Sequence, residues 1–233
     1  MINMVGYFNT PLFGTTLSIT AFVIGMYIHR KSKIAIFNPL LISAIIIICF
    51  LSYFNIDYET YNKGGSIISF FIAPATVTLA VPLYKNIRLL KERWKTIIIG
   101  ITVGSLAGLF TIFALSKLFK IDHVIMISML PKSTTTAISM EIAEQIGGIP
   151  TLAVAFTAVA GISGNLIGEY VFKIFKIEDK VSKGVALGTA SHAVGTAKAM
   201  ELGETEGALS SLSIGVAGII SVFLIPWFIS LLT

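Results

Sequence analysis

The sequence predicts an all-α integral membrane protein, built as an inverted-repeat, transporter-like helical bundle with two discontinuous helices. Hydrophobic residues make up 55% of the 233 residues and charged residues only 12%, whereas a soluble domain has about 25% charged residues. Several apolar runs approach the roughly 20 residues needed to cross a bilayer. Two further segments are apolar but interrupted by proline, glycine or ionisable residues, which is typical of transporters built from repeats.

Five apolar runs are predicted to span the membrane: Phe8–Ile28, Ile34–Tyr53, Ile97–Leu118, Thr151–Phe172 and Ala208–Leu232. The first has no basic leader and is too long for a signal peptide, so we expect it to be a mature span. Segment 66–84 must also cross, although Pro74 and Pro82 interrupt it. Segment 121–148 must cross an even number of times, either as a short helix pair broken at Pro131 or as a re-entrant hairpin.

The loops predict the orientation of these spans. Segments 29–33, 85–95 and 173–183 are rich in lysine and arginine, whereas loop 55–63 carries two carboxylates against one lysine. Because lysine and arginine accumulate in cytoplasmic loops, we expect the basic segments inside and the N-terminus outside. The net charge of +5 arises largely from these loops and does not indicate a nucleic-acid partner.

The sequence carries no signature of an enzyme. It has one cysteine, Cys49, so no intrachain disulfide can form. It has no metal-spaced cluster of cysteine and histidine, no phosphate-binding loop and no nucleophile elbow. We therefore expect no catalytic residue, metal or cofactor.

Weak internal similarity divides the chain into a first repeat, 1–118, and a second repeat, 119–233, within a single membrane domain. A broken helix is predicted near 71–84 in the first repeat and near 187–202 in the second. The loop charges give the two halves opposite orientations. An inverted pair makes alternating access around a midplane site geometrically natural.

The polar run 190–203 is the strongest candidate site, because ionisable groups deep in a membrane usually mark a substrate or ion path. An unwound stretch there can present main-chain amides to an anion. The side chains expected to assist are those of Ser191, His192, Thr196 and Lys198, with Gly195 in the break. His192 is also a candidate for proton coupling. Alternatively, these groups only satisfy backbone carbonyls at the break, or Lys198 extends to the interface.

Two other segments supply candidate binding residues. Pro74 and Thr76 lie in the interrupted segment of the first repeat, where Pro74 removes an amide donor. Lys132, Ser133 and Thr134 follow Pro131 and can hold a carboxylate, or can form an ordinary helix cap. Glu141 follows on the same helix as a second candidate for proton or cation coupling, or as a solvated charge at a helix end.

A cluster of small residues around Asn165 indicates close helix packing. Gly161, Gly164 and Gly168 flank this residue in the middle of a predicted span. Small residues allow helices to approach closely, and an amide can bond across such a contact.

Five short motifs stand out: Tyr61–Gly65, Ala73–Val77, Ala80–Lys85, Leu130–Ser133 and Ala190–Lys198. Together they resemble those of the LrgB/CidB family of antiholin-like bacterial membrane proteins. The family also includes the C-terminal half of the plastidial glycolate/glycerate translocator. The resemblance covers essentially the whole chain and implies a multi-pass protein of the bacterial cell membrane.

This resemblance implies two functions. One is transport of small monocarboxylates of the pyruvate, glycolate and glycerate class, by alternating access and with proton or cation coupling. The other is holin/antiholin-like regulation of murein hydrolase activity and lysis, with a small LrgA/CidA-type partner. The sequence favours transport, because a scaffolding bundle has little use for paired helix breaks with ionisable residues. The expected partners are a small carboxylate, the lipid bilayer, a second copy in a homodimer and the small membrane protein.

Overall fold

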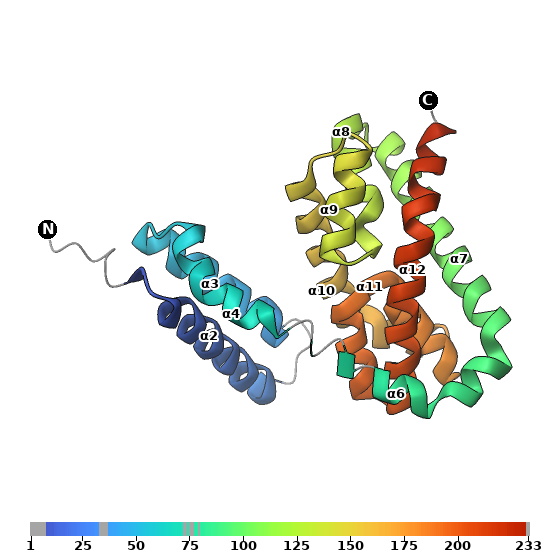
Figure 1. Cartoon of the computed structure of the whole chain (residues 1–233), viewed down its shortest axis with the longest axis horizontal. Helices are drawn as coiled ribbons and strands as arrows, with labels where there is room; N and C mark the ends of the chain where they lie inside the picture. The colour runs from blue at the N-terminus through green and yellow to red at the C-terminus, as the bar shows by residue number, and fades with distance from the viewer. Residues whose placement is uncertain (1–7, 33–36, 72–73, 75–76, 79, 232–233) are drawn as a thin grey trace, which may run out of the picture. The chain divides into compact units, whose positions relative to one another are not determined.

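A computed structural model describes residues 8–32, 37–71, 74, 77–78 and 80–231, and every regular element among them is a helix. The chain divides into two compact units, residues 1–78 and 79–233 (Figure 1). Four of the described helices are long and apolar enough to cross a membrane. The prediction of an all-α membrane protein is therefore confirmed.

The first unit consists of α2 (Pro11–Ser32), α3 (Pro39–Phe54) and α4 (Tyr58–Phe70). Asn38 and Asp57 cap the starts of α3 and α4 through their side chains, and Pro39 suits the first helical position. Gly14 and Gly25 let α2 approach α4 and α3 so closely that a Cβ atom at either position would meet backbone. Small residues at contacts of this kind are typical of membrane helix pairs.

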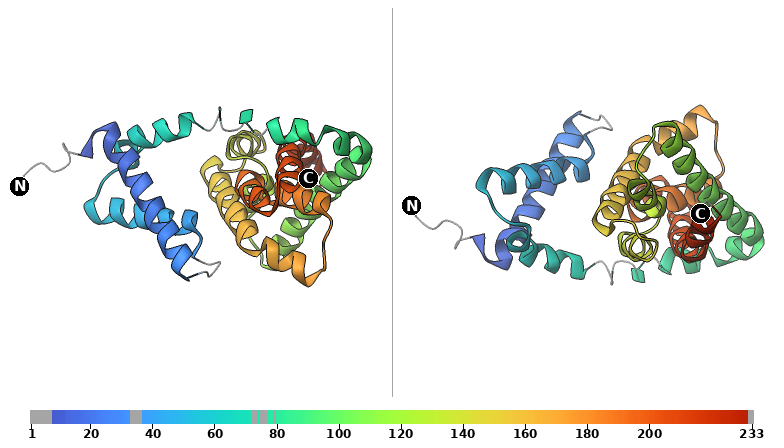
Figure 2. Two further views of the ribbon diagram at one scale, coloured as in Figure 1. Left: turned by 90° about the horizontal axis from the view of Figure 1, so that it is seen from below. Right: turned by 90° about the horizontal axis from the view of Figure 1, so that it is seen from above.

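The second unit is larger and contains all of the remaining described helices. They are α6 (Ala80–Lys85), α7 (Ile87–Leu118), α8 (His123–Met129), the 3-10 helix η2 (Leu130–Ser133), α9 (Thr136–Gln145), α10 (Pro150–Ile174), α11 (Lys180–Leu202) and α12 (Glu204–Ser230). Within this unit, α7 and α12 both run from the end that carries α6 towards the end that carries α8, and α10 runs the opposite way (Figure 1). Viewed from below and above, α11 lies between α10 and α12 (Figure 2).

Two large apolar clusters, with a smaller third cluster around Phe172 and Leu187, hold the second unit together. Ile97, Ile101 and Leu209 are among the buried residues of one cluster, and Ile142 and Ile225 are among those of the other. The outward faces of the helices are also apolar: Ile99 and Phe110 on α7 are 61% and 58% exposed. A helical bundle with an apolar exterior can satisfy its backbone inside a bilayer, so this exposure fits a lipid-facing surface.

The observed helices differ in length from the predicted spans. α3 has 16 residues and is shorter than the other apolar spans. α7 begins at Ile87 rather than at Ile97, so its first turns include the basic segment. Segment 121–148 forms two short helices, α8 and α9, joined by η2 with Pro131 near its start.

The two basic segments of the second unit lie at the same end of that unit. Arg93 Nη1, on α7, is 3.4 Å from Asp179 Oδ1, which lies just before α11. This arrangement is required by a topology that places both segments in the cytoplasm. The outside location of the N-terminus and the inverted-repeat relation between 1–118 and 119–233 stay predictions.

Of the two predicted helix breaks, the structure describes one in full. α11 contains a non-helical residue, His192, within the predicted region 187–202. In the other region, 71–84, α4 ends at Phe70 and α6 begins at Ala80. Thr76 lies outside the described residues, whereas Pro74 is described and exposed.

Removal of the α11 cap is expected to destabilise the protein at neutral pH. Asp179 accepts hydrogen bonds from the Ser182 N–H and hydroxyl, both at 2.8 Å. These bonds hold the pKa of Asp179 below its usual range. They therefore stabilise the folded protein at any pH above the pKa that Asp179 has in the unfolded chain. This stabilisation disappears as the pH falls through the lower pKa of Asp179 in the folded protein. Asp179→Ala should lower the free energy of unfolding by about 1 kcal/mol at pH 7.

Thermal melting in detergent at several pH values measures this effect. The difference between wild type and Asp179→Ala should shrink as the solution is acidified below pH about 4. Glu178→Ala removes a neighbouring exposed carboxylate and is the matched control. A difference that stays constant down to the lowest pH would contradict the capping role.

Candidate functional site

The break in α11 is centred on His192. Its backbone has φ 42° and ψ −131°, a combination that residues with a Cβ rarely adopt and that costs free energy. The ring is buried, with 5% of the residue exposed. Its Nε2 lies 2.9 Å from the Thr157 carbonyl oxygen of α10. Because a carbonyl oxygen can only accept, this nitrogen carries the hydrogen and donates a hydrogen bond to it. α10 thus holds the strained residue in place.

Small residues on α10 make room for the break. A Cβ at Gly161 would lie 2.7 Å from His192 Cε1, and one at Gly164 would overlap the Ser191 hydroxyl. Asn165 Nδ2 donates to the Val194 carbonyl oxygen at 3.2 Å, which satisfies an acceptor close to the break. The predicted packing role of these glycines and of Asn165 is confirmed.

Hydroxyl groups complete the inner side of the break. Thr196 Oγ1 lies 3.0 Å from the His192 carbonyl oxygen and 2.7 Å from Ser210 Oγ of α12. Ser191 and Thr196 are buried, at 1% and 2% exposed. Both side chains therefore pack inside the bundle, in contact with neighbouring helices.

A cavity of about 490 Å³ lies between α7 and α11, and η2 contributes Lys132 and Ser133 to its lining. Gly100, Gly104 and Gly108 line it on α7, where the lack of side chains leaves room beside Thr96 and Ile97. Thr189 lines it on α11, three residues before His192. The volume is in the range of small-molecule sites, which is roughly 300–1,000 Å³.

Lys132 provides the positive charge of this cavity. Its Nζ donates to Ser133 Oγ at 3.1 Å, and no carboxylate of the described residues lies within ion-pair distance of it. An ammonium held in apolar surroundings without a counter-charge favours the binding of an anion.

Thr189 provides a second polar group. Its Oγ1 is buried and has no hydrogen-bond partner within the described part of the chain. Buried hydroxyls are normally paired, and an unpaired one is often explained by a ligand or a water molecule. Lys132 and Ser133 can bind a small anion whose charged end meets the ammonium, and Thr189 lies beside them on α11.

Lys198 has a different environment from Lys132. Its Nζ lies 3.1 Å from Glu201 Oε2 and 3.5 Å from Glu169 Oε2. It does not line the cavity. With two carboxylates already beside it, this ammonium is less available to a substrate than that of Lys132.

The other predicted site residues are distributed as follows. Thr134 is buried, and its hydroxyl donates to the Pro131 carbonyl at 2.8 Å, which supports η2. Gly195 is buried against the preceding turn of α11. Glu141 is exposed on α9 and is not part of the cavity lining. Sequence reasoning missed Thr189 and the α7 glycines, although the four-residue spacing of Gly100, Gly104 and Gly108 is visible in the sequence.

The model of the LrgB-like family matches residues 18–231 of the chain. The protein belongs to this family. The match includes both basic segments of the second unit, η2 and the whole of α11.

Two relatives extend this result over nearly the full length. The antiholin-like protein LrgB of Bacillus cereus (strain B4264) is 41% identical over 223 residues, covering 94% of this chain and 96% of the relative. The antiholin-like protein LrgB of Bacillus anthracis (strain A0248) matches with the same identity and coverage. No solved structure is significantly similar to the chain. The protein is therefore a helical membrane protein of the LrgB-like family.

Proposed function

We propose that this protein is an antiholin-like regulator of murein hydrolase activity and lysis, acting in the bacterial cell membrane with a small holin-like partner of the LrgA type. The observation that carries this proposal is the 41% identity to proteins named antiholin-like, over 94% of the chain. Similarity of that extent includes both compact units, so it concerns the whole protein and not an isolated motif.

Deletion and complementation in a bacterium that encodes a member of this family test the regulatory role. Loss of the family member should increase autolysis and the murein hydrolase activity of cell extracts, and expression of this chain should restore both. Restoration should also require the gene for the small membrane partner. Unchanged lysis after deletion, or full restoration without the partner, would contradict the proposal.

Transport of a small monocarboxylate is a second candidate function, favoured by one specific observation. The cavity beside the α11 break holds Lys132, whose ammonium has no carboxylate partner among the described residues. A carboxylate there gains a charge-assisted hydrogen bond that offsets its desolvation. Movement of such an anion across the membrane by alternating access is compatible with the regulatory role, because metabolite flux can alter lysis indirectly.

Uptake of labelled pyruvate, glycolate and glycerate into proteoliposomes tests the second candidate. We expect uptake of at least one of them to saturate and to be inhibited by the others. We propose that His192 couples a proton to this movement. Glu141 is a second candidate, although it is exposed and lies outside the cavity lining. Equal uptake by protein-free liposomes would exclude transport and leave the regulatory proposal unaffected.

Labelling of single cysteines is expected to show segments 29–33, 85–95 and 173–183 in the cytoplasm. The reason is the excess of lysine and arginine in these three segments. Cysteines at Lys31, Arg88 and Lys180, in a Cys49→Ala background, should resist an impermeant thiol reagent added to intact cells. The background change is needed because Cys49 is exposed.

A cysteine at Glu59, in the first turn of α4, is the matched control and should react in the same cells, since segment 55–63 is predicted to lie outside. Reaction of the Arg88 position from outside would overturn the topology.

A further inference from the structure

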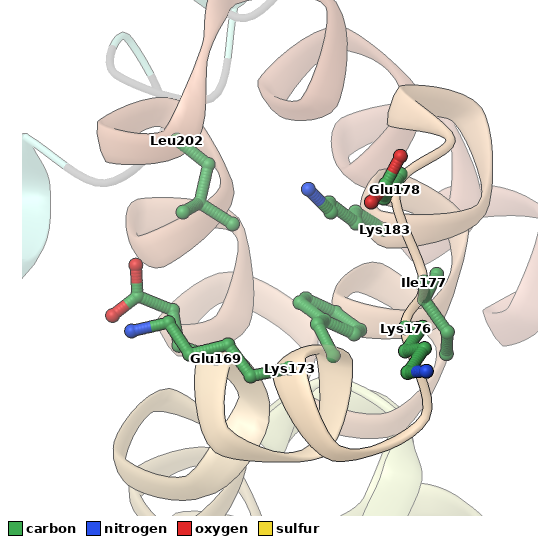
Figure 3. A pocket seen from close by; sticks show the side chains of 8 residues that line it. Glu169, Lys173, Lys176, Ile177, Glu178, Lys183 and Leu202 are labelled. Carbon is green, nitrogen blue, oxygen red and sulfur yellow. The ribbon is translucent and has the colours of Figure 1, made fainter.

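A second pocket lies at the C-terminal end of α10. The charged residues that line it differ from those of the Lys132 cavity. The volume of this second pocket is about 320 Å³, and it is formed by the last turns of α10, the loop to α11, and parts of α11 (Figure 3). Lys173, Lys176 and Lys183 line it, and Lys183 extends towards its middle (Figure 3). Phe172, Ile177 and Leu202 form its apolar part and belong to one hydrophobic cluster.

Three lysines and two carboxylates, Glu169 and Glu178, line this pocket, so its lining has a net charge of +1. None of its three lysines forms an ion pair with a residue that the structure describes. Of the two carboxylates in the lining, Glu169 lies 3.5 Å from Lys198, which lies outside the pocket. Glu178 remains as the other lining carboxylate. The net positive charge of the lining favours an anionic ligand.

The position of the pocket restricts which anion can reach it. α10 is a membrane-spanning candidate of 25 residues that ends at Ile174. A helix of that length extends over roughly 37 Å, more than the hydrocarbon core of about 30 Å. We therefore expect its last turn at the depth of the lipid headgroups. At this depth the lysines lie level with the phosphate groups of the lipids. The apolar residues of the pocket lie level with the glycerol and the first carbons of the acyl chains.

We propose that this pocket binds the phosphate headgroup of an anionic phospholipid. Lys173, Lys176 and Lys183 contact the phosphate oxygens, while Phe172 and Leu202 contact the glycerol and the first carbons of the acyl chains. Basic pockets between membrane helices recognise anionic headgroups in this way. A soluble acidic peptide or free phosphate has the charge but leaves the apolar part of the pocket uncovered, which is why a lipid fits better.

Native mass spectrometry of the delipidated full-length protein in detergent tests this proposal. Phosphatidylglycerol should bind about tenfold more strongly than phosphatidylcholine. The combined variant Lys173→Gln, Lys176→Gln, Lys183→Gln should lose this preference, with an affinity for phosphatidylglycerol that is on the order of a hundredfold weaker, since each of the three lysines near a headgroup contributes roughly 1 kcal/mol. If the combined variant does not fold, Lys183→Gln alone should weaken binding roughly fivefold.

The matched control is the combined variant Lys31→Gln, Lys91→Gln, Lys95→Gln, which removes the same charge from exposed lysines on α2 and α7. This control should retain the preference for phosphatidylglycerol. The proposal is overturned if both combined variants lose the same affinity, or if wild type does not distinguish the two lipids. It is also overturned if inorganic phosphate at equal concentration displaces phosphatidylglycerol, because the pocket would then select a free anion.

Discussion

Replacement of Gly195 by leucine is expected to destabilise the second unit strongly. A Cβ at this position would lie against the Leu187 carbonyl oxygen and 2.6 Å from Ser191 Cβ, both in the part of α11 before the break. Neither neighbour is the far end of a flexible side chain, so the two halves of α11 would have to separate. Overpacking of this kind lowers the free energy of unfolding by up to about 3 kcal/mol.

The measurements are the yield of monodisperse protein in detergent and its melting temperature. Gly215→Leu is the matched control, because Gly215 is also a helical glycine but a Cβ there meets no atom within 4 Å. The control should remain monodisperse, with a melting temperature close to that of wild type. Wild-type behaviour of Gly195→Leu would show that the close contact within α11 is not required.

The predicted apolar spans agree with the observed helices because hydrophobicity is a property of local sequence. The run predicted at Thr151–Phe172, for example, appears as α10 over Pro150–Ile174. The errors arise where charged residues continue a helix beyond its apolar part. α7 begins ten residues before the predicted Ile97 because lysine, arginine and glutamate favour helices, and Arg88 pairs with Glu92 at 3.0 Å on its surface.

The position of the α11 break depends on long-range contacts, so local sequence could indicate only its region. Glycine adopts unusual backbone angles most easily, which made Gly195 the natural centre of the predicted break. The structure instead has the unusual angles at His192. That residue is held by the Thr157 carbonyl and accommodated by Gly161, 35 and 31 residues earlier in the chain.

The sequence also could not show which of Lys132 and Lys198 is the better candidate for binding, because their surroundings depend on long-range contacts. Lys198 lies in the most polar run, which made it the first choice for binding a carboxylate. Its pairing with Glu201 follows from their spacing of three residues, but its contact with Glu169 depends on the packing of α10 against α11. The cavity at Lys132 likewise needs α7, η2 and α11 together. We therefore place Lys132 ahead of Lys198 in the proposed site.

Lys132→Met is expected to weaken the binding of a small carboxylate by roughly ten- to hundredfold. The lost interaction is a hydrogen bond to a charged group, worth about 1.5–3 kcal/mol, and each 1.4 kcal/mol corresponds to a factor of ten. The same change should leave the melting temperature equal or higher, because it removes an ammonium that has no carboxylate partner among the described residues. Ligand titration monitored by thermal melting in detergent measures both effects in one experiment.

Two further variants separate a role in binding from a role in folding. Lys132→Arg keeps the charge in a cavity of about 490 Å³ and should retain most of the affinity. Lys198→Met leaves Glu169 and Glu201 without their common partner, so it should lower the melting temperature while affecting carboxylate binding less than Lys132→Met. A larger loss of binding in Lys198→Met than in Lys132→Met would move the site back to the polar run of α11. Unchanged binding in both variants would remove the carboxylate site, and with it the structural support for transport.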